Sequence, residues 1–284
     1  MRGARSKRER IRPRAAASAE PAAHRGTARV LRVLEFLAQN SGGFTLSALS
    51  RELHVPKSSL LAILRTFADR GYLEQRANGA YALGSKAVEL GIRSASSHEL
   101  PAVAAPALLD LMQKSGETAF LGVLAHDASE IVYIDKVESR QKIRYSASLG
   151  ERRPLYCTAP GLAVFAFLPE AERERLLASL RLVPLTKRTV TDSNAIRARL
   201  DEVRRTGVAV SIEGFIAGAS GIAAPIFDRQ SRPVATCTVV GPTARIIAQK
   251  NRLVAWVKAA GEAVTRSLGG YQPGQGATGG HSAR

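Results

Sequence analysis

Between residues 30 and 83 the chain carries three helix-like segments and a hairpin in immediate succession, an order that leaves little choice of fold. Apolar residues recur at helical spacing over 30–37, and the polar and glycine-rich stretch 40–43 ends that run. Thr45 then stands where a helix N-cap is expected, ahead of a leucine-rich segment over 46–53. The spacing therefore predicts a first helix and a shorter second helix.

A short turn leads from the second helix to a third. Residues 54–56 end in proline, which closes the second helix. The pattern over 57–70 predicts a helix, and Gly71 is its expected stop. Its inward positions are Leu60, Ile63, Leu64 and Phe67. A short helix, a tight turn and a longer helix are typical of a helix-turn-helix.

A hairpin follows at once. Segments 72–77 and 80–83 flank Asn78 and Gly79, residue types that tolerate the positive φ angles of a type I′ turn. We interpret the whole as a winged helix-turn-helix over 27–84. A generic small helical bundle with an attached hairpin remains an alternative, since it buries leucines with the same period.

The charge of the chain favours a polyanionic partner. Lys and Arg number 41 against 24 for Asp and Glu, a net charge of +17. The first 29 residues alone hold nine basic and two acidic residues. We expect 1–26 to be a basic disordered tail, because its Ala, Ser, Pro and Gly background cannot bury apolar surface. It is either a DNA-contacting arm or a dispensable solvated leader.

The length of 284 residues suggests two domains at roughly 150 residues each. Apolar runs are too short for a membrane span, and no apolar stretch follows the basic start as in a signal peptide, so we expect a cytoplasmic protein with no membrane partner. Cys157 and Cys237 are too few and too widely spaced for a disulfide framework or a metal site. We predict two reduced thiols, no metal and no cofactor.

The rest of the chain indicates an α+β domain. An apolar pattern predicts a linker helix over 85–100, with Pro101 and Pro106 marking its boundary to a domain over 101–269. Expected strands are 119–125, 131–137, 143–148, 208–212, 222–227 and 234–240, and expected helices are 107–114, 161–167, 171–180, 196–206 and 245–268. This order fits a mainly antiparallel sheet. A Gly-rich tail over 270–284 should be disordered.

Several short motifs occur one after another along the chain. They are TLSALS at 45–50, VPKSS at 55–59, RGYL at 70–73, YALG at 81–84, GET at 116–118, VYIDKVES at 132–139, GERRPL at 150–155, IAAPI at 222–226 and GP at 241–242. In this collinear order the chain, from about residue 28 to 268, resembles the IclR family of bacterial transcriptional regulators. The resemblance implies a winged helix that binds double-stranded operator DNA, a GAF-like effector domain, homodimers or homotetramers, and control by a small molecule, often an organic acid.

The start of the second helix, the third helix and the wing supply the expected DNA contacts. These residues are Thr45, Lys57, Ser58, Ser59, Leu61, Ala62, Arg65 and Arg76. Lysine, serine and arginine can bind phosphates or base edges. Where many family members have a His-Arg pair, this chain has Leu61 and Ala62, which offer apolar contact only, for example to a thymine methyl group. Alternatively Leu61 is partly core, and Arg76 is merely solvated.

The resemblance places the effector between the loop over 150–158, the helix that follows it and the last two strands. The expected residues are Tyr156, Thr158, Ala159, Ser211, Ser220, Gly221, Thr238 and Val240. A helix start with free N–H groups near Thr158 would suit a carboxylate. Several positions depart from the family: Gly221 replaces a usual cysteine, Gly214 an acidic residue, Tyr156 a histidine, and Pro160-Gly161-Leu162 a Gly-Lys segment. Tyr156 is either a pocket wall, which would admit an aromatic acid, or a packed core residue.

These features predict a sequence-specific DNA-binding regulator, repressor or activator, controlled by a small organic acid, with no catalytic residue. Two alternatives stay open. The first is a ligand-processing enzyme with an accessory nucleic-acid-binding module, in which Cys157 would be the candidate nucleophile. The second is a nonspecific DNA-coating protein that binds through its basic tail.

Overall fold

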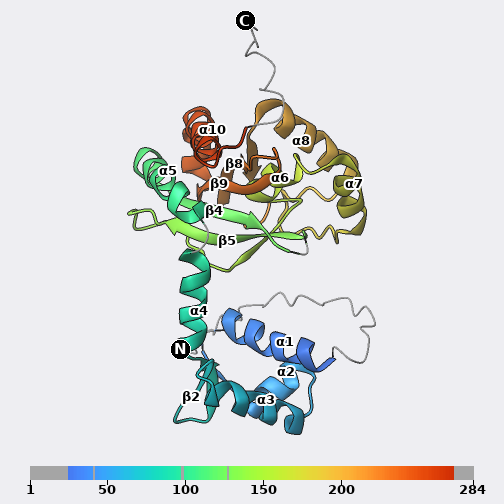
Figure 1. The fold of residues 1–284 in the computed structure, drawn as a ribbon. Helices are drawn as coiled ribbons and strands as arrows, with labels where there is room; N and C mark the ends of the chain where they lie inside the picture. Colours follow the sequence, from blue (N-terminus) through green and yellow to red (C-terminus); the bar gives the residue numbers. More distant parts are fainter. Residues whose placement is uncertain (1–24, 41, 97–98, 127, 272–284) are drawn as a thin grey trace, which may run out of the picture. The chain divides into compact units, whose positions relative to one another are not determined.

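The computed structural model describes residues 25–40, 42–96, 99–126 and 128–271. It divides into two compact units, Met1–Ile92 and Arg93–Arg284 (Figure 1). The tail predicted over 1–26 and the tail predicted over 270–284 lie almost wholly outside the described residues. Each unit is treated by itself below.

The first unit contains the predicted helices. Its elements are α1 (Arg25–Gln39), β1 (Phe44–Thr45), α2 (Leu46–Leu53), α3 (Lys57–Asp69), β2 (Leu73–Gln75), β3 (Ala80–Leu83) and the start of α4 (Ser85–Ser96). Their apolar faces meet in one core made of Val33, Leu37, Leu49, Val55, Leu60, Leu64, Leu73 and Tyr81. The helices bury one face each, as their 3.6-residue pattern requires.

The wing has three strands instead of two. They lie in the order β1-β3-β2, and both pairs are antiparallel. Strand β1 is only two residues long, so it leaves no alternating pattern in the sequence. It nevertheless fixes the start of α2, because Thr45 belongs to the strand and also caps the helix.

The hairpin turn differs from the predicted type I′ turn. Gly79 has φ +73°, but Asn78 has no positive φ. The Gly79 N–H donates to the carbonyl of Arg76 at 2.8 Å, and the Arg76 N–H donates to the carbonyl of Ala80 at 2.8 Å. This is a three-residue loop with a left-handed glycine at its end, the second common way to close a hairpin.

The helix after the linker begins earlier than predicted. Helix α5 runs over Glu99–Ser115 and includes both prolines that were expected to mark a boundary. Pro101 lies in the first turn, where no N–H is needed. Pro106 is exposed within the helix, so the carbonyl it leaves unpaired faces water. Burial of Ala104, Leu108 and Leu111 in the core holds the helix together around it.

The second unit is built on a six-stranded sheet of order β6-β5-β4-β9-β8-β7. Its strands are β4 (Thr118–Leu124), β5 (Glu130–Val137), β6 (Arg152–Pro154), β7 (Ala209–Ile212), β8 (Ala219–Phe227) and β9 (Pro233–Pro242). Its other helices are α6 (Ala159–Phe165), α7 (Glu170–Ser179), α8 (Ser193–Thr206), α9 (Thr243–Ala248) and α10 (Lys250–Ser267). Every strand pair is antiparallel, so the predicted α+β class is confirmed.

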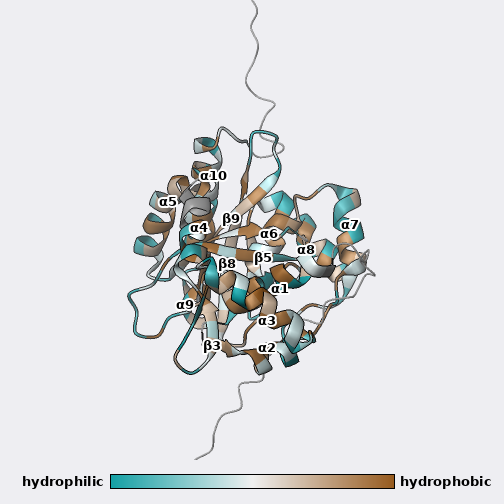
Figure 2. Ribbon diagram, turned by 60° about the horizontal axis from the view of Figure 1, so that its bottom comes forward, coloured by the Kyte–Doolittle hydropathy of each residue, from teal (hydrophilic) through white to brown (hydrophobic). Residues whose placement is uncertain are grey.

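Helices cover both faces of this sheet. Strand β8 shows why: Ile222, Ala224 and Ile226 face the core shared with α5 and α10, whereas Ala223 faces the core shared with α6 and α8. Strands buried on both sides are expected to be apolar throughout. Figure 2 accordingly shows brown along α6 and the central strands and more teal on the outer helix α7.

Two predicted elements of this unit are wrong. Residues 143–148 form no strand, because side chains and not a neighbouring strand bind their carbonyls: Arg245 binds that of Ile143, and Thr118 that of Tyr145. The three-residue β6 pairs with β5. The final helix predicted over 245–268 is two helices, since Gln249 with ψ 10° separates α9 from α10.

Candidate functional site

The helix-turn-helix owes its shape to three residues. His54 adopts the left-handed conformation at the C-cap of α2. Val55 is buried in the core, and its carbonyl accepts a hydrogen bond from the Ser50 hydroxyl at 2.8 Å. Pro56 precedes the first residue of α3, and its carbonyl accepts from the Leu60 N–H at 3.1 Å. The turn is therefore fixed from both sides, which fixes the direction of α3.

One face of α3 is open to solvent and basic. Lys57, Ser58, Ala62 and Arg65 are exposed, while Ser59 and Leu61 are half-buried. Among the described residues no hydrogen-bond or ion-pair partner is recorded for the side chain of Lys57 or of Arg65. Both cations are thus available for phosphate oxygens or base edges. Leu61 is not among the apolar residues packed on the core of this unit, so it faces outward with Ala62.

Two other predicted DNA contacts already have structural roles. The Thr45 hydroxyl accepts from the Ala48 N–H at 3.3 Å and caps α2. The Arg76 guanidinium donates to the Gly42 carbonyl at 3.2 Å and pairs with Glu74 at 3.4 Å. Both side chains are nonetheless exposed, and Arg76 ties the wing to the segment that precedes β1.

A pocket opens in the second unit where β8, β9, α6 and the loop after β7 meet. Of the predicted effector residues it is lined by Thr158, Ala159, Ser211, Ser220, Gly221 and Val240. The lining also includes Pro160 and Gly214, which the sequence analysis named as departures from the family, Phe215 and Ile216 of the loop after β7, and Ala219 at the start of β8. Sequence reasoning did not name Tyr133, Tyr145 and Arg153 as effector residues. Its empty space, including the open mouth, is about 350 Å³. Only one of these residues, Arg153, is charged.

Tyr156 and Thr238 do not line the pocket, so these two predictions need correction. The Tyr156 hydroxyl donates to the Val183 carbonyl at 2.8 Å and accepts from the Val183 N–H at 3.2 Å, within the core shared with α6 and α8. Thr238 is fully buried, and its hydroxyl donates to that of Thr236 at 3.3 Å. Of the two alternatives for Tyr156, a pocket wall or a packed core residue, the contacts support the packed core residue.

Arg153 is buried inside the pocket. Strand β6 alternates, so Arg152 points outward and Arg153 inward, with a side chain only 7% exposed. Its guanidinium lies between two rings, 5.2 Å from the centre of Tyr133 and 5.1 Å from the centre of Phe215. It donates to Glu151 at 2.7 Å, to the Tyr145 hydroxyl at 3.0 Å and to the Arg152 carbonyl at 2.8 Å. Its Nε–H is buried and has no hydrogen-bond partner within the described part of the chain.

The start of α6 offers less than predicted for an anion. Pro160 has no N–H, the Gly161 N–H donates to the Thr158 hydroxyl at 3.1 Å, and the Leu162 N–H donates to the Thr158 carbonyl at 2.9 Å. In this first turn only Ala159 could still present an N–H to a ligand. A carboxylate in this pocket would therefore depend on Arg153 more than on the helix.

The loop that carries Phe215 is held by a neighbouring segment. The Thr186 hydroxyl donates to the Glu213 carbonyl at 2.6 Å, and the Thr189 hydroxyl donates to the Gly214 carbonyl at 2.8 Å. A side chain at Gly214 would clash, since a Cβ there would lie 2.3 Å from the Cys157 carbonyl oxygen. This explains why a glycine stands where an acidic residue was expected by resemblance.

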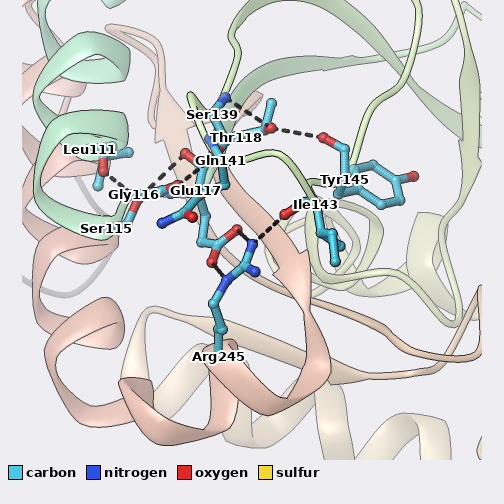
Figure 3. A network of polar contacts seen from close by, with 10 residues as sticks. All are labelled: Leu111, Ser115, Gly116, Glu117, Thr118, Ser139, Gln141, Ile143, Tyr145 and Arg245. Carbon is cyan, nitrogen blue, oxygen red and sulfur yellow. Dashed lines mark hydrogen bonds and ion pairs between the residues drawn. The ribbon is translucent and has the colours of Figure 1, made fainter.

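A polar network fixes the segment that carries Tyr145, another residue of the pocket lining (Figure 3). The Thr118 hydroxyl donates to the Tyr145 carbonyl at 2.8 Å and accepts from the Ser139 N–H at 3.2 Å. Close by, the guanidinium of Arg245 makes two hydrogen bonds to the carboxylate of Glu117, which is 1% exposed, and a third to the Ile143 carbonyl at 2.8 Å. Tyr145 is thereby held against the pocket from the ends of β4 and α9.

Neither cysteine suits catalysis. Burial raises the pKa of the Cys157 thiol to about 12, and burial raises that of Cys237 to about 12 as well. Thiols with such pKa values stay protonated at neutral pH and are poor nucleophiles. The described residues hold no cluster of three His, Cys, Asp or Glu side chains that could bind a metal ion. Among the described helices, none combines the length and apolarity that crossing a bilayer requires.

A second cavity lies between β8 and α10. It is lined by Lys258, Glu262 and Arg266 among others. Lys258 already donates to the Thr206 carbonyl at 3.0 Å, and charges of both signs line the space. It contains no buried donor without a partner among the described side chains, so the pocket around Arg153 is the better ligand site.

Comparison with known proteins covers both units. Residues 26–77 match the IclR helix-turn-helix domain, and residues 92–266 match the family described as Bacterial transcriptional regulator IclR C-terminal. The chain is 30% identical to the Transcriptional repressor IclR of Escherichia coli over 86% of this chain and 90% of that protein. It is 34% identical to the Glycerol operon regulatory protein of Streptomyces coelicolor, over 85% and 95%.

A solved structure extends the likeness to three dimensions. An IclR homologue of Microbacterium hydrocarbonoxydans, complexed with 4-hydroxybenzoate, superposes with a TM-score of 0.77 at 26% identity, over 86% of this chain and 98% of that one. Two domain matches in the predicted order, together with relatives at 30% identity or more over most of their length, show the family. The chain belongs to the IclR family of DNA-binding transcriptional regulators.

Proposed function

We propose that this protein is an effector-controlled regulator that binds operator DNA through α3 and the wing and a small organic acid through the pocket around Arg153. The observation that carries the DNA part is the open face of α3, on which the side chains of Lys57 and Arg65 have no hydrogen-bond or ion-pair partner among the described residues. Ser58 and Ala62 lie on the same face, and Ser59 and Leu61 at its edge. Cations supply most of the affinity, and the other side chains would read base edges.

The effector part rests on the charge of the pocket. One buried arginine stands among mainly apolar and aromatic side chains, and a buried charge needs a partner of opposite sign. Glu151 supplies part of that partner, from a side chain that is 43% exposed. An organic anion bound in the pocket would balance the rest of the charge of Arg153. The relative that is complexed with 4-hydroxybenzoate supports an acid in this class of domain.

A homodimer or homotetramer fits the surface of the first unit. Leu31 on α1 and Val88 and Leu90 on α4 are more than half exposed. A second copy of the chain packed on this unit would cover these side chains. Two copies would place two α3 helices on the half-sites of a palindromic operator. The effector would then favour one arrangement of the paired helices, in the cytoplasm where the chromosome lies.

Titration of the protein with its own upstream DNA and with a scrambled duplex of equal length, at two salt concentrations, tests the DNA part. We expect at least about a hundredfold preference for the genuine duplex at physiological salt. Equal affinity for both duplexes would contradict sequence-specific binding and favour nonspecific coating. Turnover of a bound acid would instead favour the enzyme alternative.

A further inference from the structure

We infer that Arg153 is the carboxylate anchor of the pocket and that the acid it takes is an aromatic monocarboxylate. This inference rests on the effector role proposed above for the same pocket and names the chemistry of its ligand. Four observations support it: a donor without a partner, a charge that is only partly balanced, polar side chains that are already bonded, and walls made of rings.

The donor is the Nε–H of Arg153. It is buried and has no hydrogen-bond partner among the described residues, whereas the two terminal nitrogens of the same group already donate to Arg152, Tyr145 and Glu151. An unpaired buried N–H is costly and rare in folded proteins. A ligand oxygen beside Nε would satisfy it.

The charge of Arg153 favours an anion over a neutral ligand. Arginine keeps its proton at every accessible pH. The side chain of its ion-pair partner Glu151 is 43% exposed, whereas that of Arg153 is 7% exposed. Water therefore solvates the carboxylate and weakens the ion pair, but it hardly solvates the guanidinium. A carboxylate inside the pocket would meet the guanidinium on its desolvated side, where charge-assisted hydrogen bonds are strongest.

The three aliphatic hydroxyl groups that line the pocket, those of Thr158, Ser211 and Ser220, are already engaged. Thr158 donates to the Pro154 carbonyl at 2.7 Å, and Ser211 donates to the Cys157 carbonyl at 2.6 Å. The Ser220 hydroxyl shares a hydrogen bond with that of Thr243 at 2.9 Å and accepts from the Glu213 N–H. A polyhydroxylated acid would find few free partners for its hydroxyl groups, and burying them unpaired would weaken binding.

Aromatic side chains make up part of the pocket wall, namely Tyr133, Tyr145 and Phe215. Phe120 stacks on Tyr133 with ring centres 4.3 Å apart and meets the edge of Tyr145 at 5.9 Å. Phe215 covers the guanidinium from the other side, and Val240 adds an aliphatic surface. Phe120 and Arg153 already lie over faces of these rings, so a ligand ring would gain edge-on contacts with them, which an aliphatic chain does not make. One charge and an apolar, ring-lined space select a ring that bears one carboxylate.

The test is calorimetric titration of the full chain with benzoate, its neutral analogue benzamide, and the polyhydroxylated acid gluconate. Four proteins are compared: the wild type, Arg153→Met, Arg153→Lys, and Arg152→Met as a matched control on the outward face of β6. Circular dichroism shows whether each variant is folded, and Arg153→Lys keeps the charge if the methionine variant is not. DNA affinity is measured on the same samples with and without benzoate.

We expect the wild type and Arg152→Met to bind benzoate roughly ten- to a hundredfold more tightly than benzamide, the range of one charge-assisted hydrogen bond. Arg153→Met should lose that preference, and Arg153→Lys should keep part of it. Unchanged preference in Arg153→Met, or the absence of benzoate binding to the wild type, would overturn the anchor. Gluconate binding as tight as benzoate binding would overturn the aromatic class.

The DNA measurement separates this inference from the function on which it rests. If benzoate binds through Arg153 but leaves DNA affinity unchanged, the anchor stands and the effector role fails. If another acid alters DNA affinity equally in the wild type and Arg153→Met, the effector role stands and the anchor is wrong.

Discussion

Removing one partner of the buried ion pair between Glu117 and Arg245 should strongly destabilise the second unit. Replacing Arg245 with methionine keeps the bulk of the side chain but leaves the Glu117 carboxylate, 1% exposed, without its cation. Breaking a buried pair from one side costs about 3–5 kcal/mol. Because the Arg245 side chain is itself 32% exposed, water can partly replace it, and we expect about 2–4 kcal/mol.

That loss is measurable by urea and thermal unfolding of the full chain. At roughly 2–4 °C per kcal/mol for a domain of this size, Tm should fall by about 4–16 °C. The double variant Glu117→Gln with Arg245→Met should recover much of the loss, since no unpaired charge stays buried. Arg232→Met, which breaks an exposed pair with Asp228, is the matched control and should cost less than about 1 kcal/mol. An Arg245→Met variant as stable as this control would refute the reasoning.

Three further predictions follow from the same contacts. Replacing Lys57 with alanine should weaken binding to every duplex and lower the slope of log affinity against log salt by about one, measured by filter binding; an unchanged slope would exclude a phosphate contact. Partial burial raises the pKa of Glu151, but hydrogen bonds from the Ser148 N–H and from Arg153 hold it below its ordinary value. The ion pair between Glu151 and Arg153 therefore stabilises the fold at pH values above the usual carboxyl pKa, and this stabilisation is lost as pH falls through the lowered pKa of Glu151. Glu151→Gln should accordingly reduce the slope of unfolding free energy against pH in the acid range. A slope as steep as that of the wild type would argue against the pair. Tyr156→Phe should cost about 1 kcal/mol in urea titration and leave acid binding unchanged, whereas weaker acid binding would return Tyr156 to the pocket wall.

The elements that could be predicted from sequence are those with a strong local signal. Thr45 caps α2 as expected because a capping hydroxyl acts within three residues of itself. Helix α3 begins at Lys57 as expected because Pro56 cannot continue the preceding helix. The wrong predictions concern features that depend on tertiary contacts. Pro106 was expected to mark a boundary, but α5 continues through it because core contacts hold the helix on both sides of the proline.

The residues of the pocket likewise divide into those that sequence could place and those that depend on tertiary contacts. Ser211, Ser220 and Val240 could be placed by resemblance because their strands are well marked. Arg153 could not, since it follows a second arginine and only the alternation of the short β6 turns one outward and the other inward. Phe215 and Tyr145 lie in loops whose positions depend on side chains far along the chain, Thr186 and Arg245 among them. Such long-range contacts leave no periodic pattern.

The central claim is that an acid in the pocket changes how tightly α3 binds DNA. The most direct measurement is the Kd of the full chain for its upstream duplex, by fluorescence anisotropy, at increasing concentrations of each acid that calorimetry shows to bind. The account predicts a change in Kd of about fivefold or more that saturates at the calorimetric affinity of the acid. A saturating acid that leaves the Kd for DNA unchanged would contradict it.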